Sequence, residues 1–81
     1  MTDTRKAITE LLVAEFEVPA KEISDDATLE ELGLDSLAQV ELGERVTDLS
    51  GVAVSDDEVV EAKTVGRLVN LVECKMIAYA S

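Results

Sequence analysis

Apolar residues recur at helical spacing in several stretches of the chain, and polar, turn-forming residues separate these stretches. In the first stretch, the apolar residues Ile8, Leu11, Leu12 and Phe16 recur at spacings of three and four positions. Val13 is a further apolar residue beside them. This spacing predicts an amphipathic helix over residues 4–17. Thr2 or Asp3 can cap its first turn. Pro19 requires the helix to end, because a residue before proline avoids the helical conformation.

The helical period is lost between residues 18 and 31. Turn-forming residues are frequent there: Pro19, Ser24, Asp25, Asp26 and Thr28. Apolar residues nevertheless recur through this segment and just beyond it: Val18, Ile23, Leu29 and Leu32. We therefore expect a long first loop that lies across the helices and is held by these apolar side chains, rather than a mobile linker.

A second helical period covers residues 36–50, with the apolar residues Leu37, Val40, Leu42, Val46 and Leu49. Either Asp35 or Ser36 can cap the start of this helix, and the pair Ser36 and Gln39 fits a reciprocal capping box. Gly51 is expected to end the helix in the left-handed conformation.

Gly43 interrupts this second helix and costs about 1 kcal/mol relative to alanine. The helix should therefore depend on tertiary contacts more than on its own propensity. The glycine either reduces side-chain bulk at a contact or is a tolerated defect, and the sequence leaves both open.

Two more helices complete the pattern. Residues 52–54 alternate too briefly to predict a strand. Ser55 is followed by acidic residues at the positive end of a short helix over residues 56–62. Thr64 caps a last helix over residues 65–79. Its apolar stripe consists of Val65, Val69, Val72, Met76 and Tyr79, widened by Leu68 and Leu71.

Three longer helices and one short helix predict an all-α fold, a small antiparallel four-helix bundle with a long first loop. We expect residues 1–81 to form a single domain, because 81 residues are too few for two and no repeat is present. The composition is 47% hydrophobic and 2% aromatic, so the core must be aliphatic. This is too much apolar material for a disordered acidic tail.

The composition also restricts the chemistry. The chain has no histidine, which excludes a Ser-His-Asp or Cys-His nucleophile system and a histidine-ligated metal. We expect neither an enzyme nor a metal site, since a calcium loop starting at Asp48 also lacks the required glycine and glutamate. Cys74 has no cysteine or histidine partner, and a half-buried, unreactive position is expected for it.

The charge balance indicates the kind of partner. With 18 acidic and 7 basic residues the net charge is −11, which repels nucleic acids and anionic membrane surfaces and favours proteins with basic surfaces. We find no signal peptide and no apolar run of membrane-spanning length. A cytoplasmic protein is expected.

Ser36 is the strongest candidate for chemistry. It follows Asp35 and a glycine turn at the start of a helix, where free backbone N–H groups and a partial positive charge would stabilise a phosphate on its oxygen. The position suits a phosphoester. A role as a helix cap alone is the alternative, because serine is common at this position.

The motif LGLDSL at residues 32–37, followed by VEL at residues 40–42, resembles the signature of acyl carrier proteins. The helix order agrees over nearly the whole chain. The resemblance implies that Ser36 carries 4′-phosphopantetheine, donated by coenzyme A and attached by a phosphopantetheinyl transferase. It implies that Asp35 assists this metal-dependent transfer, with helix capping as the alternative.

The same resemblance implies that acyl intermediates are carried as thioesters on the arm's terminal thiol. The partners would be a ketosynthase, an acyltransferase or ligase, and tailoring enzymes of a synthase. The chain would be a monomeric carrier that other enzymes use as a substrate.

Acidic residues on the second helix form a candidate docking face. Glu41, Glu44 and Asp48 lie three and four residues apart and share one face. Leu37 and Val40 lie near its rim, and the face would extend to Asp56, Asp57, Glu58 and Glu61. The resemblance implies docking against basic patches of partner enzymes. Solvated charges without a partner are the alternative.

The motif also differs from primary fatty acid carriers, which it otherwise resembles. Ala38 replaces an aspartate, and Gly43, Glu44 and Arg45 follow Leu42, so that a carboxylate stands at an apolar methionine position. These differences favour a polyketide or other specialised pathway over fatty acid synthesis. Asp35 argues against a peptidyl carrier. A rival hypothesis is an unmodified acidic adaptor, which explains the charge and the helices but not the motif.

Overall fold

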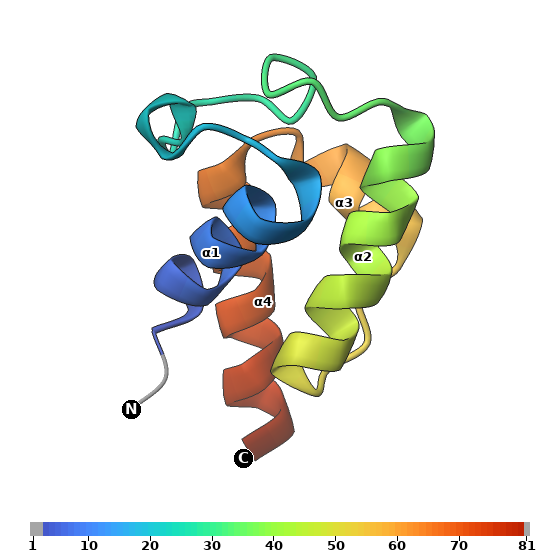
Figure 1. The fold of residues 1–81 in the computed structure, drawn as a ribbon. Helices are drawn as coiled ribbons and strands as arrows, with labels where there is room; N and C mark the ends of the chain where they lie inside the picture. The colour runs from blue at the N-terminus through green and yellow to red at the C-terminus, as the bar shows by residue number, and fades with distance from the viewer. Residues whose placement is uncertain (1–2, 81) are drawn as a thin grey trace.

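The computed structural model describes residues 3–80, and side chains through residue 78. It contains four α-helices: α1 (Thr4–Phe16), α2 (Ser36–Ser50), α3 (Asp56–Ala62) and α4 (Val65–Ala80). A short 3-10 turn, η1 (Ala20–Glu22), lies in the long first loop. The predicted all-α fold, with three longer helices, one short helix and a long first loop, is confirmed (Figure 1).

The helix directions place the start of α2 at the opposite end of the bundle from the start of α1 and the end of α4. In Figure 1, α1 runs opposite to α2 and α4, and the short α3 joins the end of α2 to the start of α4. The loop and the start of α2 lie at one end of the bundle, and the start of α1 and the end of α4 lie at the other. The candidate serine is therefore at the loop end.

The core is aliphatic, as the composition predicts, and receives residues from every helix and from the loop. Its fully buried larger side chains are Ile8, Leu12, Leu29, Leu42, Val46, Val59, Val65, Leu68, Val69 and Val72. Phe16 and Met76 pack against this core while partly buried. Val13 and Leu49 are exposed, and the side chain of Tyr79 lies outside the described part.

Most of the predicted helix ends are confirmed. Asp3 Oδ1 caps α1 by accepting from Lys6 N–H, and Thr64 Oγ1 caps α4 by accepting from Arg67 N–H at 3.2 Å. Gly51 ends α2 with φ 78°. The helix α1 ends one residue earlier than predicted, because Glu17 adopts the left-handed conformation at φ 56°.

Gly43 lies at a close contact between α2 and α3. A Cβ atom there would lie 3.2 Å from Val59 Cγ2 and 3.5 Å from the Val54 carbonyl oxygen. Beside it, Thr47 Oγ1 donates to the Val54 carbonyl and accepts from Val54 N–H, at 3.2 and 2.9 Å. Of the two interpretations of Gly43, the structure supports reduced bulk at a contact.

The long first loop lies across the helices, as predicted from its apolar residues, and it is bound to the junction of α3 and α4. Its backbone makes three hydrogen bonds there, which join Leu29 N to Lys63 O, Val65 N to Ala27 O, and Gly66 N to Asp25 O, at 2.9–3.0 Å. The side chains of Val18 and Leu29 in the loop are buried in the core. The loop thus forms a fixed wall of the molecule beside the start of α2.

Candidate phosphopantetheine attachment site

A tight turn brings the candidate serine to the surface. Gly33 adopts φ 86°, a conformation that favours glycine, and its N–H donates to the Glu30 carbonyl. Leu34 then enters the core, with 4% of its surface exposed. Asp35 and Ser36 follow directly and are exposed at the first turn of α2.

Asp35, and not Ser36, caps α2. Its Oδ1 accepts a hydrogen bond of 2.8 Å from Ala38 N–H, and its backbone carbonyl accepts from Gln39 N–H. Ser36 is the first helical residue. The predicted capping box between Ser36 and Gln39 is wrong, because the Gln39 side chain is buried and donates to the Leu34 carbonyl at 2.9 Å.

This arrangement fits a phosphorylated serine. The hydroxyl of Ser36 takes no part in the cap and is open to solvent. The first N–H groups of a helix have no intrahelical acceptor, and their partial positive charge stabilises an anion at this position. A phosphodiester on Ser36 Oγ would therefore be stabilised without disturbing the cap.

The predicted docking residues of α2 lie on its surface. Leu37 is 68% exposed and Val40 is half-buried. Glu41, Glu44 and Asp48 are all exposed. Arg45 on the same helix pairs with Glu15 of α1, at 3.5 Å between Nε and Oε1. The face combines one prominent apolar side chain with several carboxylates.

On α3, Asp56 is exposed, but Glu58 also has a structural task. It completes a capping box with Ser55, whose N–H donates to Glu58 Oε1 at 3.0 Å. Its Oε2 pairs with Lys75 Nζ of α4 at 2.9 Å. The hydrogen bond from the Ser55 backbone, followed by Lys75, lowers the pKa of Glu58 below its usual value. Glu58 therefore holds α3 against α4.

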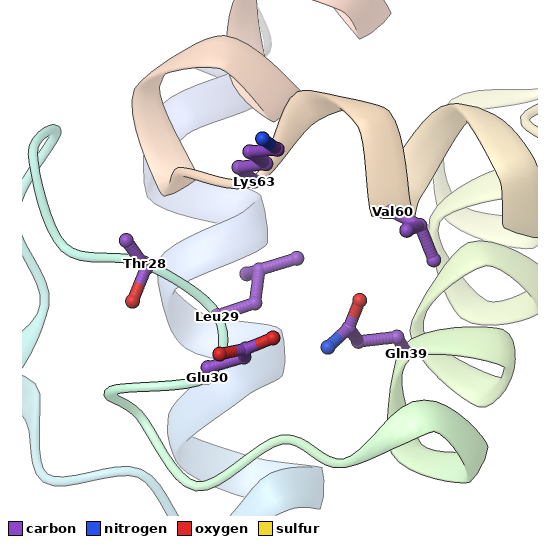
Figure 2. Close-up of a pocket in the computed structure, with 6 residues that line it drawn as sticks. All are labelled: Thr28, Leu29, Glu30, Gln39, Val60 and Lys63. Atoms are coloured by element: carbon purple, nitrogen blue, oxygen red, sulfur yellow. The ribbon is translucent and has the colours of Figure 1, made fainter.

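A cavity of about 290 Å³ opens beside the start of α2, between the long loop and α3. Figure 2 shows the side chains that line it: Thr28, Leu29, Glu30, Gln39, Val60 and Lys63. No pattern in the sequence predicts these residues as a group, because the loop, α2 and α3 meet only in the folded chain.

The chain matches known proteins over most of its length. The family model for the phosphopantetheine attachment site matches residues 6–72. An acyl carrier protein of Porphyromonas gingivalis is 32% identical over 74 residues, which are 90% of this chain and 95% of the relative. One of Saccharopolyspora erythraea is 35% identical over 65 residues, 79% of this chain and 68% of the relative. The chain belongs to the acyl carrier protein family.

Membership of this family indicates how such a site is used. Acyl carrier proteins are carriers rather than catalysts, they hold phosphopantetheine, and they work with a phosphopantetheinyl transferase and with synthase enzymes. This acyl carrier protein presents the LGLDSL motif within the matched range. The resemblance seen in the motif is confirmed at the level of the family.

Two other features of the carrier bear on its chemistry. Cys74 is exposed, so the expectation that it is half-buried is wrong. Within residues 3–80, no group of three or more potential ligand side chains could hold a metal. The helices of this part are also too short or too polar to cross a membrane.

Proposed function

We propose that Ser36 is the attachment residue and that this carrier presents acyl groups on its phosphopantetheine arm. The observation that carries the proposal is the exposed Ser36 hydroxyl at the first turn of α2, left free because Asp35 supplies the cap. In the transfer, Ser36 Oγ loses its proton and forms a bond to phosphorus, while the pyrophosphate bond of coenzyme A breaks and 3′,5′-ADP leaves. When bound, the arm supplies a thiol that holds acyl groups as thioesters.

The chain's own residues position this chemistry. Gly33 turns the backbone, Leu34 anchors the turn in the core, and Asp35 fixes the first turn of α2. The exposed carboxylates of α2 would attract basic surfaces of the transferase and of synthase enzymes, which raises the rate of encounter at low salt.

The attachment residue is tested by incubation with coenzyme A, magnesium and a broad-specificity phosphopantetheinyl transferase, followed by intact mass measurement. We expect one phosphopantetheine adduct on the wild-type chain and on Ser24→Ala, an exposed serine of the loop. Ser36→Ala should remain unmodified. An adduct that persists on Ser36→Ala would contradict the assignment, and no adduct on any chain would favour the unmodified adaptor.

We assign the carrier to a polyketide or other specialised pathway. The support is the departure from the fatty acid pattern at Ala38 and Glu44, and Glu44 is exposed on the docking face of α2, where a partner would meet it. Comparison of malonyl transfer to the holo chain by acyltransferases of the two pathway types tests this assignment. Faster transfer by the fatty acid enzyme would overturn it.

A further inference from the structure

Gln39 is one of two buried polar residues in the described part of the chain. It is 8% exposed, and the other such residue, Thr4, lies at the opposite end of the bundle. Removing an amide from water is unfavourable unless it finds a hydrogen-bond partner. The Gln39 side chain finds the backbone carbonyl of Leu34, which accepts from Nε2 at 2.9 Å. This buried amide therefore acts at the start of α2.

The bond holds the peptide unit directly before Asp35 and Ser36. The backbone N–H of Gln39 donates to the Asp35 carbonyl, which is the first regular bond of α2. The Leu34 carbonyl lies one residue before this bond, and the side-chain amide of Gln39 reaches back to it. Gln39 thus binds the turn twice, once through its backbone and once through its side chain. The peptide plane that leads the chain into Ser36 is fixed by the second bond.

The other bonds of this turn hold its neighbours and not this carbonyl. Leu34 N–H donates to the Leu29 carbonyl at 3.0 Å. Asp35 Oδ1 accepts from Ala38 N–H at 2.8 Å. A buried carbonyl that loses its donor is costly, so the turn would rearrange to give it a new partner. Loss of the Gln39 amide should therefore change the direction in which the chain enters α2.

The exposed docking residues of α2 do not depend on this bond. Leu37 is 68% exposed, and Glu41 and Glu44 are also on the surface. Figure 2 shows Gln39 extending from α2 toward the loop instead. A change at Gln39 should therefore alter how Ser36 is presented in a docked complex, and not the docking itself.

We propose that Gln39 is a positioning residue for the transfer of phosphopantetheine to Ser36. Its amide holds the Leu34 carbonyl and thereby keeps Ser36 Oγ and the Asp35 carboxylate in one orientation toward coenzyme A. The proposal rests on attachment of the arm at Ser36. A displacement of about 1 Å can slow a reaction about a hundredfold, and a partial loosening of the turn should slow this one about tenfold.

The test compares transferase kinetics on the wild-type chain and on Gln39→Met, with coenzyme A, magnesium and a broad-specificity phosphopantetheinyl transferase. Methionine is also unbranched and has a similar helix propensity, but it has no donor. We expect kcat to fall about tenfold, with KM nearly unchanged. A chain that is merely less stable gives the opposite split, because a smaller folded fraction of the substrate raises the apparent KM. A wild-type kcat for Gln39→Met would overturn the proposal.

Thr4→Val is the matched control. Thr4 is also 8% exposed, and its Oγ1 donates to Met76 Sδ at 3.6 Å, at the end of the bundle away from Ser36. The variant loses a side-chain hydrogen bond and should keep the wild-type kcat. An equal fall of kcat in Thr4→Val and Gln39→Met would assign the effect to general loosening of the bundle and would refute the positioning role.

Gln39→Leu keeps the test decisive if Gln39→Met folds poorly. Leucine also lacks the donor, but it packs like the other aliphatic side chains of the core. Both variants should lower kcat, and amide exchange should become faster in both at Ala38, whose N–H bonds to Asp35. Circular dichroism checks that each chain is folded. A folded Gln39→Leu chain with the wild-type kcat would contradict the proposal.

Failure of the positioning role is distinguishable from failure of the attachment site. If the mass measurement shows an adduct that requires Ser36, but kcat does not depend on Gln39, only the positioning role is wrong. If Ser36→Ala is modified as fully as the wild type, the proposed function and the positioning role are both wrong.

Discussion

Asp35 and Ser36 are neighbours in the sequence, but the fold gives them different tasks. Asp35 accepts the Ala38 N–H bond that starts α2, and Ser36 keeps its hydroxyl free at the surface. A serine cap would have engaged this hydroxyl in the helix. The capping aspartate therefore leaves the proposed attachment residue available, and its charge stands beside the proposed site of transfer.

The two roles of Asp35 can be separated by substitution. Asp35→Asn keeps a good cap, so the free energy of unfolding should be nearly unchanged, whereas Asp35→Ala should lose about 1 kcal/mol. If the carboxylate assists the transfer, the transferase should modify both variants at a rate at least about tenfold lower than that of the wild type. Urea unfolding and transferase kinetics measure these effects. Modification of Asp35→Asn at the wild-type rate would leave Asp35 as a cap alone.

The long first loop behaves as a structural element although it has little regular structure. Its backbone bonds to the α3–α4 junction, and Thr28 and Glu31 bond to each other within it, with Glu31 Oε1 2.9 Å from Thr28 N. The hydrogen bond from the Thr28 backbone N–H is the main cause that lowers the pKa of Glu31, and the hydrogen bond from the Thr28 side chain adds to it. The loop therefore provides one wall of the cavity and fixes the turn before α2.

Gly66 at the start of α4 tests how tightly this loop is docked. A Cβ atom there would lie 3.0 Å from both the Cβ and the carbonyl oxygen of Asp25. Gly66→Ala should therefore lower the free energy of unfolding by about 1 kcal/mol or more, because overpacking exceeds the gain in helix propensity. It should also speed amide exchange at Leu29, whose N–H bonds to Lys63.

The matched control is Asn70→Ala, an exposed position on the same helix. It should stabilise the chain by about 0.5 kcal/mol, since alanine is the better helix former. Denaturation of both variants in urea gives the comparison. A Gly66→Ala chain more stable than the wild type would show that the loop can shift to admit the added methyl group with little loss of free energy of unfolding.

The net charge of −11 is spread over a small molecule, and its placement matters more than its sum. Acidic residues of α2 lie near the exposed Leu37 at the loop end, where Ser36 is found. Glu10 on α1 and Glu73 on α4 contribute to the same total from other helices. Docking through α2 should depend on where the charges lie. An effect of the total charge should instead be the same wherever the charges lie.

This distinction gives a prediction for charge reversal. The pair Glu41→Lys and Glu44→Lys should raise the KM of the transferase several-fold at low salt, and the difference should shrink as salt rises. The control pair Glu10→Lys and Glu73→Lys changes the net charge equally, at exposed positions of α1 and α4. Equal KM values for the two double variants would remove the case for docking on α2.

The sequence by itself determined the helices and the attachment motif, because helical periods, caps and the LGLDSL turn depend on residues close together in the chain. It predicted α2 at residues 36–50 and placed Ser36 at its start. It also anticipated that the loop would lie on the helices.

Only the tertiary structure decided what depends on residues far apart in the chain. Gly43 needed the position of Val59 to be understood, and the choice between Asp35 and Ser36 as cap needed the burial of Gln39. Lys63 came to line the cavity through the docking of the loop. Packing brings such residues together with no local signal, since the pattern along each segment records which face is buried but not what lies against it.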